Sequence, residues 1–369
     1  TVNMFFAYGI PFFLAFALSL TLTVLVRFFA LRFGVVDRPN KARKIHTQPT
    51  ALLGGVAIFI SFTLLALYYM FWSAHPALHS GYVQVTSTHI RGIVLAGLIL
   101  ILGGVLDDIF DLPPKQQIIF PVLAVLVVMF AGIGITTITN PFGGYIHLDS
   151  VEWTIASFNG VSFRLHPLAE VFTVLWLLGM MFTTKLLDGV DGLVGGIGSI
   201  AAFMLFLVSL NHTLLQYDTA LLAVLFLGAT LGFLVFNWHP AKIFLGEGGA
   251  LYLGFLLGVL SIIAGGKITT ALLVMGLPIL DVVWIIIRRW IFEKKSPFTS
   301  ADKKHLYHRL IAAGLSQRQT VLIYYFTAVA FGSSVFFIQG EQKLIAFGVL
   351  LIFMIILAML LVFKYNKER

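Results

Sequence analysis

The stretch GIVLAGLILILGGVLDDIFDL, residues 92–112, decides the architecture of this chain. Its apolar part ends abruptly at two adjacent carboxylates, Asp107 and Asp108. An uncharged run of this kind predicts a helix inside a membrane, because lipid offers no partner to backbone N–H and C=O groups that are not bonded within a helix. Since the run is short for a full crossing, we expect the helix to begin nearer Val85, with Arg91 snorkelling toward the interface.

The composition of the whole chain agrees with this interpretation. Of 369 residues, 59% are hydrophobic and 11% are charged, whereas about a quarter of the residues in ordinary soluble domains are charged. This imbalance excludes a soluble globular enzyme, a disordered chain and a typical nucleic-acid binder, despite the net charge of +8. With no cysteine there is no disulfide, no zinc–thiolate site and no thiol nucleophile. We predict an all-α, polytopic integral membrane protein.

Eleven long apolar runs are visible, and we expect each to be a transmembrane helix within one catalytic domain, residues 1–369. The first run lacks a basic leader and a small-residue cleavage site, which indicates a retained span and not a signal peptide. The runs are residues 4–30, 52–72, 92–106, 118–135, 168–182, 193–210, 219–236, 249–265, 268–287, 321–338 and 344–363.

Basic residues indicate the orientation of these spans. Most of the 24 Lys and Arg residues lie in the loops that follow the odd-numbered runs and in the tail after Phe363. Because basic residues are retained on the cytoplasmic side, we expect the N-terminus outside and the C-terminus in the cytoplasm. The active site should then be built from five cytoplasmic loops: 31–51, 107–117, 183–192, 237–248 and 288–320.

Carboxylates gather at the same span ends. A carboxylate is poorly placed at a helix C-terminus, and several held together repel one another unless a cation joins them. We therefore interpret the set as a site for a metal and a phosphate group and not as solvated helix ends. If the first of these helices continues past 106, Asp111 shares a face with Asp107 and Asp108. The set is Asp107, Asp108, Asp188, Asp191 and Glu247.

Basic side chains accompany the carboxylates. The loop 288–320 predicts a short amphipathic helix capped by Ser300 and ending at Gly314. Three side chains suited to an anionic ligand share one face of it at i, i+3 and i+4: His305, His308 and Arg309. The first cytoplasmic loop contributes His46.

Taken in order, these segments resemble the polyprenyl-phosphate N-acetylhexosamine-1-phosphate transferases, the glycosyltransferase type 4 family. The resemblance runs from about residue 37 to 309. Within this family, the chain is similar to the N-acetylglucosamine branch. It has eleven apolar runs, and it lacks the Pro-x-His-His-His motif of the branch that makes the first peptidoglycan lipid. The motifs are DRPNKARKIH (37–46), LDDIFDLPPK (106–115), LLDGVDGL (186–193), FNWHPAKIFLGEGG (236–249), GLPILDVVWIIIRR (276–289) and DKKHLYHRL (302–310).

The resemblance implies a reaction. A UDP-N-acetylhexosamine, with N-acetylglucosamine as the expected sugar, donates its sugar 1-phosphate to a polyprenyl phosphate such as undecaprenyl phosphate. UMP is released, and a lipid-linked cell-envelope glycan begins. The implied setting is the inner (plasma) membrane with a cytoplasmic active site, and dimers are common in the family, which implies a homodimer.

The resemblance also implies roles for individual residues. Asp107 is the implied base that takes the proton of the lipid phosphate, with Asp108 beside it. The other implied catalytic residues are Asp188, Asp191 and Lys185. Substrate binding falls to Asn237, His46, His305, His308 and Arg309. Mg²⁺, or Mn²⁺, falls to Glu247, Asp108 and Asp191.

The chain departs from the family pattern at the metal site. The family usually has Asn where this chain has Lys185, Asp where it has Glu247, and His where it has Tyr307. A protonated Lys cannot coordinate Mg²⁺ but supplies a fixed positive charge. Three options stay open: Mg²⁺ is held by Glu247 and neighbouring Asp groups, Lys185 pairs with Glu247 and partly replaces the metal, or the chain is an inactive homologue.

Three other activities compete with this interpretation. A UDP-MurNAc-pentapeptide phosphotransferase would use the same chemistry. A membrane prenyltransferase usually repeats an Asp-x-x-x-Asp spacing, which Asp-Gly-Val-Asp-Gly at 188–192 fits badly. A transporter would place charges near the bilayer midplane. Asp281 alone approaches that place, and we interpret it as a helix-packing group.

Overall fold

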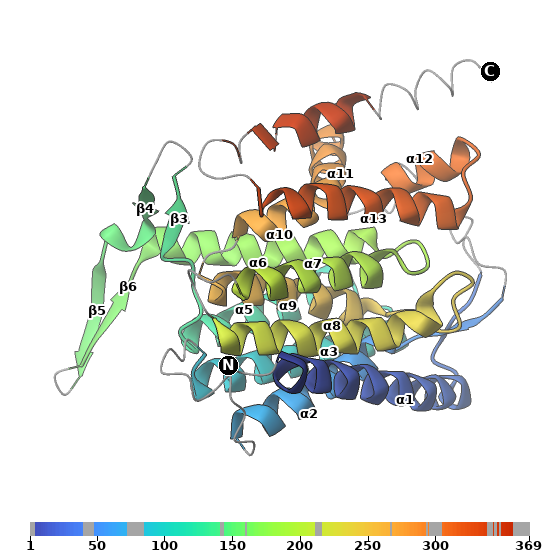
Figure 1. Cartoon of the computed structure of the whole chain (residues 1–369), viewed down its shortest axis with the longest axis horizontal. Coiled ribbons are helices and arrows are strands. Elements are labelled where there is room, and N and C mark those ends of the chain that lie inside the picture. The colour runs from blue at the N-terminus through green and yellow to red at the C-terminus, as the bar shows by residue number, and fades with distance from the viewer. Residues whose placement is uncertain are drawn as a thin grey trace.

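The computed structural model describes residues 4–39, 48–71, 85–140, 144–158, 161–210, 216–265, 268–292, 294, 305–337, 342, 345–346 and 348–356. Over these residues the chain is mainly helical. The helices pack side by side, and two β-hairpins project from one end of the bundle (Figure 1).

The helices follow one another with short connections. A π-helical turn at Phe5–Gly9 leads into the first helix, and another at Arg288–Phe292 follows the eleventh. In chain order the helices are α1 (Ile10–Phe33), α2 (Gly54–Phe71), α3 (Ser87–Phe110), α4 (Pro114–Gln117), α5 (Ile119–Phe130), α6 (Pro167–Leu187), α7 (Leu193–Ser209), α8 (Tyr217–Asn237), α9 (Glu247–Ile263), α10 (Ile268–Val274), α11 (Gly276–Ile287), α12 (Leu306–Ala312) and α13 (Gln317–Ser334).

The predicted apolar runs fall on these helices. The first ten of the eleven runs each coincide with a helix or a pair of helices, and the last run is described only in part. Five described helices are long and apolar enough to cross a membrane, or six when α10 and α11 count as one span bent by 77°. The α4–α5 pair, α7 and α9 are apolar but shorter. The chain is a multi-pass helical membrane protein, and the number eleven stays a prediction.

The predicted early start of α3 is confirmed. Thr86 caps the helix one residue after Val85, and its side-chain oxygen accepts a hydrogen bond from the His89 N–H at 3.2 Å. A hydroxyl at this position satisfies one of the backbone donors that a helix start leaves unpaired.

The helix α3 continues past Asp107 and Asp108, as the prediction assumed, but it stops one residue short of Asp111. The helix ends at Phe110, and Asp111 adopts a left-handed conformation with φ 50° and ψ 61°. Two prolines follow at 113 and 114, and a residue that precedes proline is pushed out of the helical region, so the chain must leave the helix here. Asp111 therefore does not share a helix face with Asp107 and Asp108.

The expectation of an all-α fold is also incomplete. Two antiparallel hairpins lie within residues 136–166, at one end of α6 (Figure 1). Their Thr- and aromatic-rich sequences favour strands, because such side chains pack well on a pleated surface. The strands of these hairpins are β3 (Thr137–Thr139), β4 (Tyr145–His147), β5 (Trp153–Phe158) and β6 (Val161–Leu165), and a third pair at the other end of the bundle consists of β1 (Val36–Asp37) and β2 (Thr50–Ala51).

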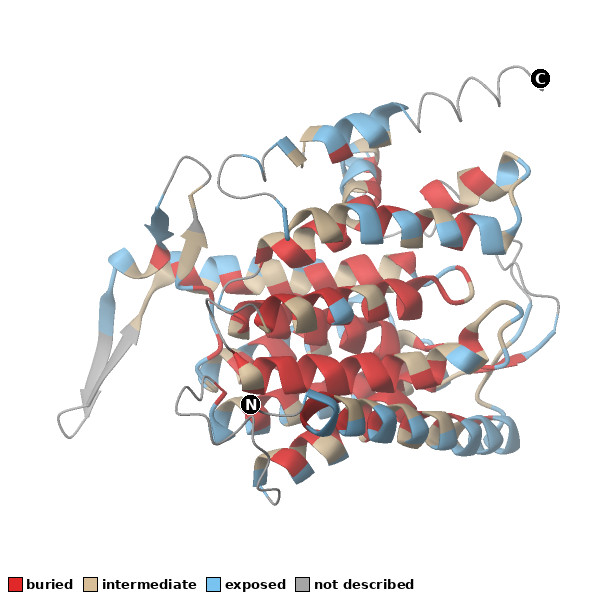
Figure 2. Ribbon diagram, in the orientation of Figure 1, coloured by how far each residue is buried: buried red, intermediate tan, exposed pale blue. Residues whose placement is uncertain are grey.

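The bundle is apolar on its surface as well as in its core. Figure 2 shows buried residues concentrated along α7, α8 and α9, whereas α1 and α13 turn one face outward. Large apolar side chains cover such outer faces, among them Phe28, Phe130 and Phe326. An outer surface of this kind is expected where lipid and not water surrounds the helices.

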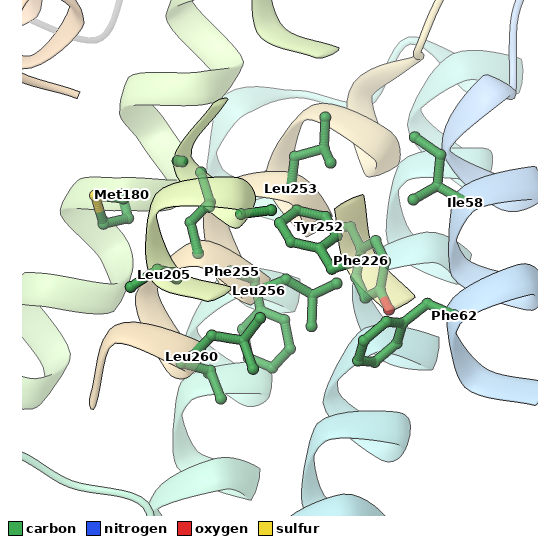
Figure 3. Packing of buried hydrophobic residues seen from close by; sticks show 14 of the residues in the cluster. Ile58, Phe62, Met180, Leu205, Phe226, Tyr252, Leu253, Phe255, Leu256 and Leu260 are labelled. Carbon is green, nitrogen blue, oxygen red and sulfur yellow. The ribbon is translucent and has the colours of Figure 1, made fainter. Parts of the chain in front are cut away.

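Aromatic rings fill the centre of the bundle. Tyr252 of α9 lies in one cluster with Phe226 of α8 and Phe62 of α2 (Figure 3). The rings of Phe59 and Tyr252 meet edge to face with their centroids 5.4 Å apart. Gly97 of α3 leaves the space for this pair, since a Cβ there would lie 2.7 Å from the Tyr252 ring.

The start of α9 is held between two helix ends by glycines. A Cβ on Gly104 of α3 would overlap the backbone of Gly248, and a Cβ on Gly55 of α2 would overlap the backbone of Gly249. Small residues of this kind allow helix backbones to approach closely inside a membrane. The two crossings fix Glu247, the first residue of α9, beside the carboxylates that end α3.

Candidate active site

The predicted site loops meet at the end of the bundle opposite the two projecting hairpins (Figure 1). The turn between α8 and α9 is bonded to the chain that enters α2: the Phe244 N–H donates to Ala51 O at 2.8 Å, and the Gly54 N–H donates to Phe244 O at 2.9 Å. These backbone bonds join the loops 31–51 and 237–248, which are far apart in the sequence.

Asn237 joins the α8–α9 turn to the start of α7. Its Oδ1 accepts the Gly192 N–H at 3.0 Å, and its Nδ2 donates to Ile243 O at 2.9 Å. The side chain is buried, and both ends of its amide are bonded to backbone. Asn237, predicted as a substrate-binding residue, thus holds two loops together.

A second group of side chains, the histidine turn, consists of Asp191, His239, Ala241 and Arg318. The His239 Nδ1–H donates to Asp191 Oδ2 at 2.7 Å, and the Ala241 N–H donates to the same oxygen at 3.1 Å. Arg318, at the start of α13, donates to His239 O at 2.9 Å and 3.2 Å. His239 was missed in the sequence, although its place inside the motif FNWHPAKIF was a usable signal.

Asp108 caps α9 from the neighbouring helix. Its Oδ1 accepts the Glu247 N–H at 3.2 Å. Gly246 precedes that amide with φ +77°, and a Cβ there would lie 2.5 Å from Asp108 Oδ2. The positive end of the α9 dipole therefore faces this carboxylate.

A third group, the lysine network, consists of Asp107, Gln117, Lys185 and Glu247. The Lys185 Nζ lies 3.0 Å from Glu247 Oε2 and 3.9 Å from Asp107 Oδ2. It also donates to Gln117 Oε1 at 2.8 Å, while Gln117 Nε2 donates to Asp107 Oδ1 at 3.0 Å. The predicted proximity of Lys185 and Glu247 is confirmed, whereas Gln117 had no sequence signal.

The lysine network lines a small, partly open hollow, whose other walls are Gly103 and Gly104 of α3, Phe120 of α5 and Leu251 of α9. Its free volume of about 10 Å³ is room for a single water-sized group, so a whole nucleotide sugar does not fit inside it.

Asp188 adds negative charge beside this network. It follows the last residue of α6, and its side chain is exposed. The protein packed around it, together with the negative charges of Glu247 and Asp191, nevertheless raises the pKa of Asp188 above its ordinary value. An added positive charge would relieve this repulsion, so the site favours a cationic partner.

The residues predicted to bind a metal are arranged for other contacts. No group of three or more His, Asp or Glu side chains among the described residues is placed to hold a metal ion. Asp108 caps α9, Asp191 is bonded to His239, and Glu247 is paired with the ammonium of Lys185. Since Mg²⁺ needs near-octahedral oxygen ligands, the predicted set does not fit it in this arrangement.

The prediction that His305, His308 and Arg309 share one helix face is wrong for His305. The helix α12 begins at Leu306, so His305 precedes it, and its buried Nδ1–H donates to Asp281 Oδ2 at 3.0 Å. The other oxygen of Asp281 accepts the Leu306 N–H at 2.9 Å. The interpretation of Asp281 as a packing group is confirmed, because its carboxylate caps α12.

The basic segment nevertheless reaches the carboxylates. The ring of Tyr307 stacks between His305 and His308, with centroids 5.4 Å and 4.4 Å away. Gly189, next to Asp188, leaves room for the Tyr307 hydroxyl, because a Cβ there would overlap it. This contact brings the loop 288–320 to the turn that carries Asp188.

Two predicted residues cannot be placed. His46 and the expected cap Ser300 lie outside the described residues. His308 and Arg309 are half-buried on α12.

Comparisons with known proteins agree with one another. The family model for glycosyl transferase family 4 matches residues 90–265. A Bacillus subtilis protein named as a probable undecaprenyl-phosphate N-acetylglucosaminyl 1-phosphate transferase is 30% identical, over 92% of this chain and 88% of the relative. A decaprenyl-phosphate N-acetylglucosaminephosphotransferase of Mycolicibacterium smegmatis is 32% identical, over 91% and 84%. A phospho-N-acetylmuramoyl-pentapeptide-transferase of Streptococcus agalactiae is 28% identical, over 58% and 59%.

Proposed function

The chain belongs to glycosyl transferase family 4, and on that premise we propose that it transfers N-acetylglucosamine 1-phosphate from UDP-N-acetylglucosamine to a polyprenyl phosphate. The products are a sugar-diphospho-polyprenol, which starts a lipid-linked cell-envelope glycan, and UMP. The relatives that match along most of their length carry names of this activity.

One structural observation carries the proposal. Four loops that are distant in the sequence gather carboxylates, a lysine and basic side chains at one end of an apolar bundle, and the described part of the loop 31–51 is bonded to them through Ala51. One substrate is a lipid whose phosphate lies at the membrane surface, and the other is a soluble anion, so both can reach this end. Phosphoryl transfer depends mainly on positioning and on stabilising charge, which such a cluster can supply.

The chemistry is a substitution at phosphorus. An oxygen of the polyprenyl phosphate bonds to the phosphorus that carries the sugar. The bond from that phosphorus to the bridging oxygen breaks, and the bridging oxygen leaves with the bonding electrons as part of UMP. Any proton on the attacking phosphate passes to Asp107, whose Oδ2 is the oxygen that faces Lys185.

Other side chains have proposed roles in binding. Asp188 and the histidine turn lie near the nucleoside of the donor, and His308 and Arg309 contact its phosphates. His305 positions this segment through Asp281. Asn237 and Asp108 hold the loops that shape the site.

The orientation belongs to the same proposal. The site loops carry most of the basic residues, so the site end faces the cytoplasm and the hairpin end faces outward from the inner (plasma) membrane. Residues 1–369 then form one catalytic domain with eleven spans. The homodimer also stays a prediction. Mg²⁺ or Mn²⁺ stays the expected cofactor, although no reaction step above is assigned to it.

A MurNAc-pentapeptide donor is the second candidate. The named relative with that substrate matches 58% of this chain, against 92% and 91% for the two N-acetylglucosamine relatives. The absence of a Pro-x-His-His-His motif also favours the smaller donor.

A donor panel tests the proposal. Purified full-length protein is incubated with undecaprenyl phosphate, Mg²⁺ and one UDP-sugar at a time, and UMP is measured. We expect release with UDP-N-acetylglucosamine and little release with UDP-MurNAc-pentapeptide. Release with the pentapeptide donor alone would replace the first candidate by the second, and no UMP with any donor would contradict both.

A further inference from the structure

Lys185 occupies the place between carboxylates where a cation is needed. Its Nζ lies 3.0 Å from Glu247 Oε2 and 3.9 Å from Asp107 Oδ2, on the wall of the small hollow described above. The side chain is 16% exposed, so the ammonium is largely withdrawn from water. A Lys in such a position is costly unless its charge is used or paired.

We propose that Lys185 is the built-in cation of this site: held by Glu247 and Gln117, its ammonium binds a substrate phosphate oxygen in the hollow and replaces a divalent ion at Glu247. The proposal rests on the proposed function only for the identity of that phosphate.

The number of hydrogen-bond donors on the Lys185 ammonium supports the binding of a ligand there. An ammonium carries three N–H donors. Glu247 and Gln117 accept two at hydrogen-bond distance, whereas Asp107 at 3.9 Å is too far for a hydrogen bond. The third donor is thus available to an oxygen that enters the hollow.

Gln117 fixes the ammonium in this place. Its Oε1 accepts from Lys185, and its Nε2 donates both to Asp107 Oδ1 at 3.0 Å and to Leu112 O at 2.8 Å. The amide is therefore locked in one orientation by acceptors that cannot donate. A cation positioned in advance costs no reorganisation when charge develops on a phosphate.

Charge also argues against a divalent ion at Glu247. An ion bound there would lie a few ångströms from the ammonium, and two positive charges at that distance repel strongly in a partly dry site. Two of the other predicted ligands are already engaged, because Asp108 caps α9 and Asp191 is bonded to His239. Metal binding through Glu247 therefore requires the ammonium to leave.

Manganese binding without substrate tests this directly. Purified protein is titrated with MnCl₂ while the free-ion electron paramagnetic resonance signal is followed. The variants are Lys185→Asn, which adds an oxygen ligand, and Lys185→Met, which only removes the charge, each with and without Glu247→Gln. We expect Lys185→Asn to gain Mn²⁺ affinity by about tenfold or more, and Glu247→Gln to remove that gain. Lys185→Met should gain less. If wild type already binds a Mn²⁺ that Glu247→Gln abolishes, the proposal is overturned.

A second measurement uses turnover. The initial rate of UMP release is measured from EDTA upward in free Mg²⁺. We expect wild type to keep a measurable rate in EDTA and Lys185→Asn to lose it and recover it with Mg²⁺. A wild-type rate of zero in EDTA that Mg²⁺ alone restores would overturn the replacement. If no donor gives UMP, the proposed function fails, while the manganese titration still decides the role of Lys185.

Discussion

The lysine network and the histidine turn are both built on carboxylates at helix ends, yet they use them differently. In the lysine network, Asp107 and Glu247 share one ammonium and line a hollow. In the histidine turn, one oxygen of Asp191 accepts two N–H donors, and the nearby arginine bonds a backbone carbonyl. Carboxylates that look equivalent in the sequence thus divide into two kinds: those that are paired with an ammonium, and those that fix the position of a turn through hydrogen bonds.

The largest effect is expected at Asp107. Asp107→Asn keeps the size and an acceptor for Gln117, so the protein should fold, but UMP release near pH 6 should fall by about 10²-fold or more. The second proton of a phosphate monoester leaves near pH 6, so at pH 8 the acceptor is already ionised and the loss should shrink. Rates of UMP release from pH 5.5 to 8.5 check this.

Asp111→Asn is the matched control, because Asp111 lies beyond the same helix end and is exposed. It should change neither rate nor melting temperature. A loss at Asp107→Asn that does not vary with pH would contradict a base and indicate that Asp107 acts through Gln117 and Lys185.

The next effect is expected from separating the ion pair. Lys185→Met leaves Asp107 and Glu247 facing each other without a cation, so we expect a lower melting temperature in detergent and a slower reaction. The cost is about 1–2 kcal/mol, less than for a fully buried pair because Glu247 is 41% exposed. Adding Glu247→Gln should recover the melting temperature but not the rate. Additive losses of stability would show that the two side chains do not interact.

A smaller effect is expected in the histidine turn. His239→Ala should raise the apparent KM for the UDP-sugar several-fold with little change in kcat, because the α8–α9 turn loses its link to Asp191. Asp191→Asn should have the same phenotype, and the double variant should be no worse than either one, since both break one contact. A drop in kcat that matches that of Asp107→Asn would erase the distinction between the two groups.

The smallest effect is expected at Arg318. Its two bonds to His239 O are exposed, and Arg318→Ala should cost about 0.5–1.5 kcal/mol, seen as a small drop in melting temperature. The KM for the donor should stay within about twofold. A large rise in KM would make Arg318 a substrate contact.

The sequence predicted helices and loops far better than contacts. Apolar runs must become helices in lipid, and so the positions of α2, α3 and α6 to α9 followed directly. The carboxylates and Lys185 could be assigned to one end because each follows such a run. The break between α10 and α11, by contrast, lies inside an uninterrupted apolar segment, and the hairpins depend on weak strand preferences.

The contacts between side chains on different helices of the site could not be predicted, and the reason is physical. Gln117 and His239 carry no local signal for the side chains they meet, since those contacts depend on how distant helices cross. The misplacement of His305 has the same origin: Asp281, on another helix, bonds its ring, and α12 begins one residue later, at Leu306. Local spacing predicts which residues share a helix face only where no side chain from another helix bonds one of those residues.

The glycine crossings at the start of α9 have a mechanical consequence. Where Gly104 meets Gly248 and Gly55 meets Gly249, the spacing of the helices is set by backbone against backbone, with no side chain that could change rotamer. A membrane that thickens or thins makes helices tilt. Because these contacts act as a pivot at the site end, we expect the tilt to displace the hairpin end most, so that the distances within the lysine network stay the same in bilayers of different thickness.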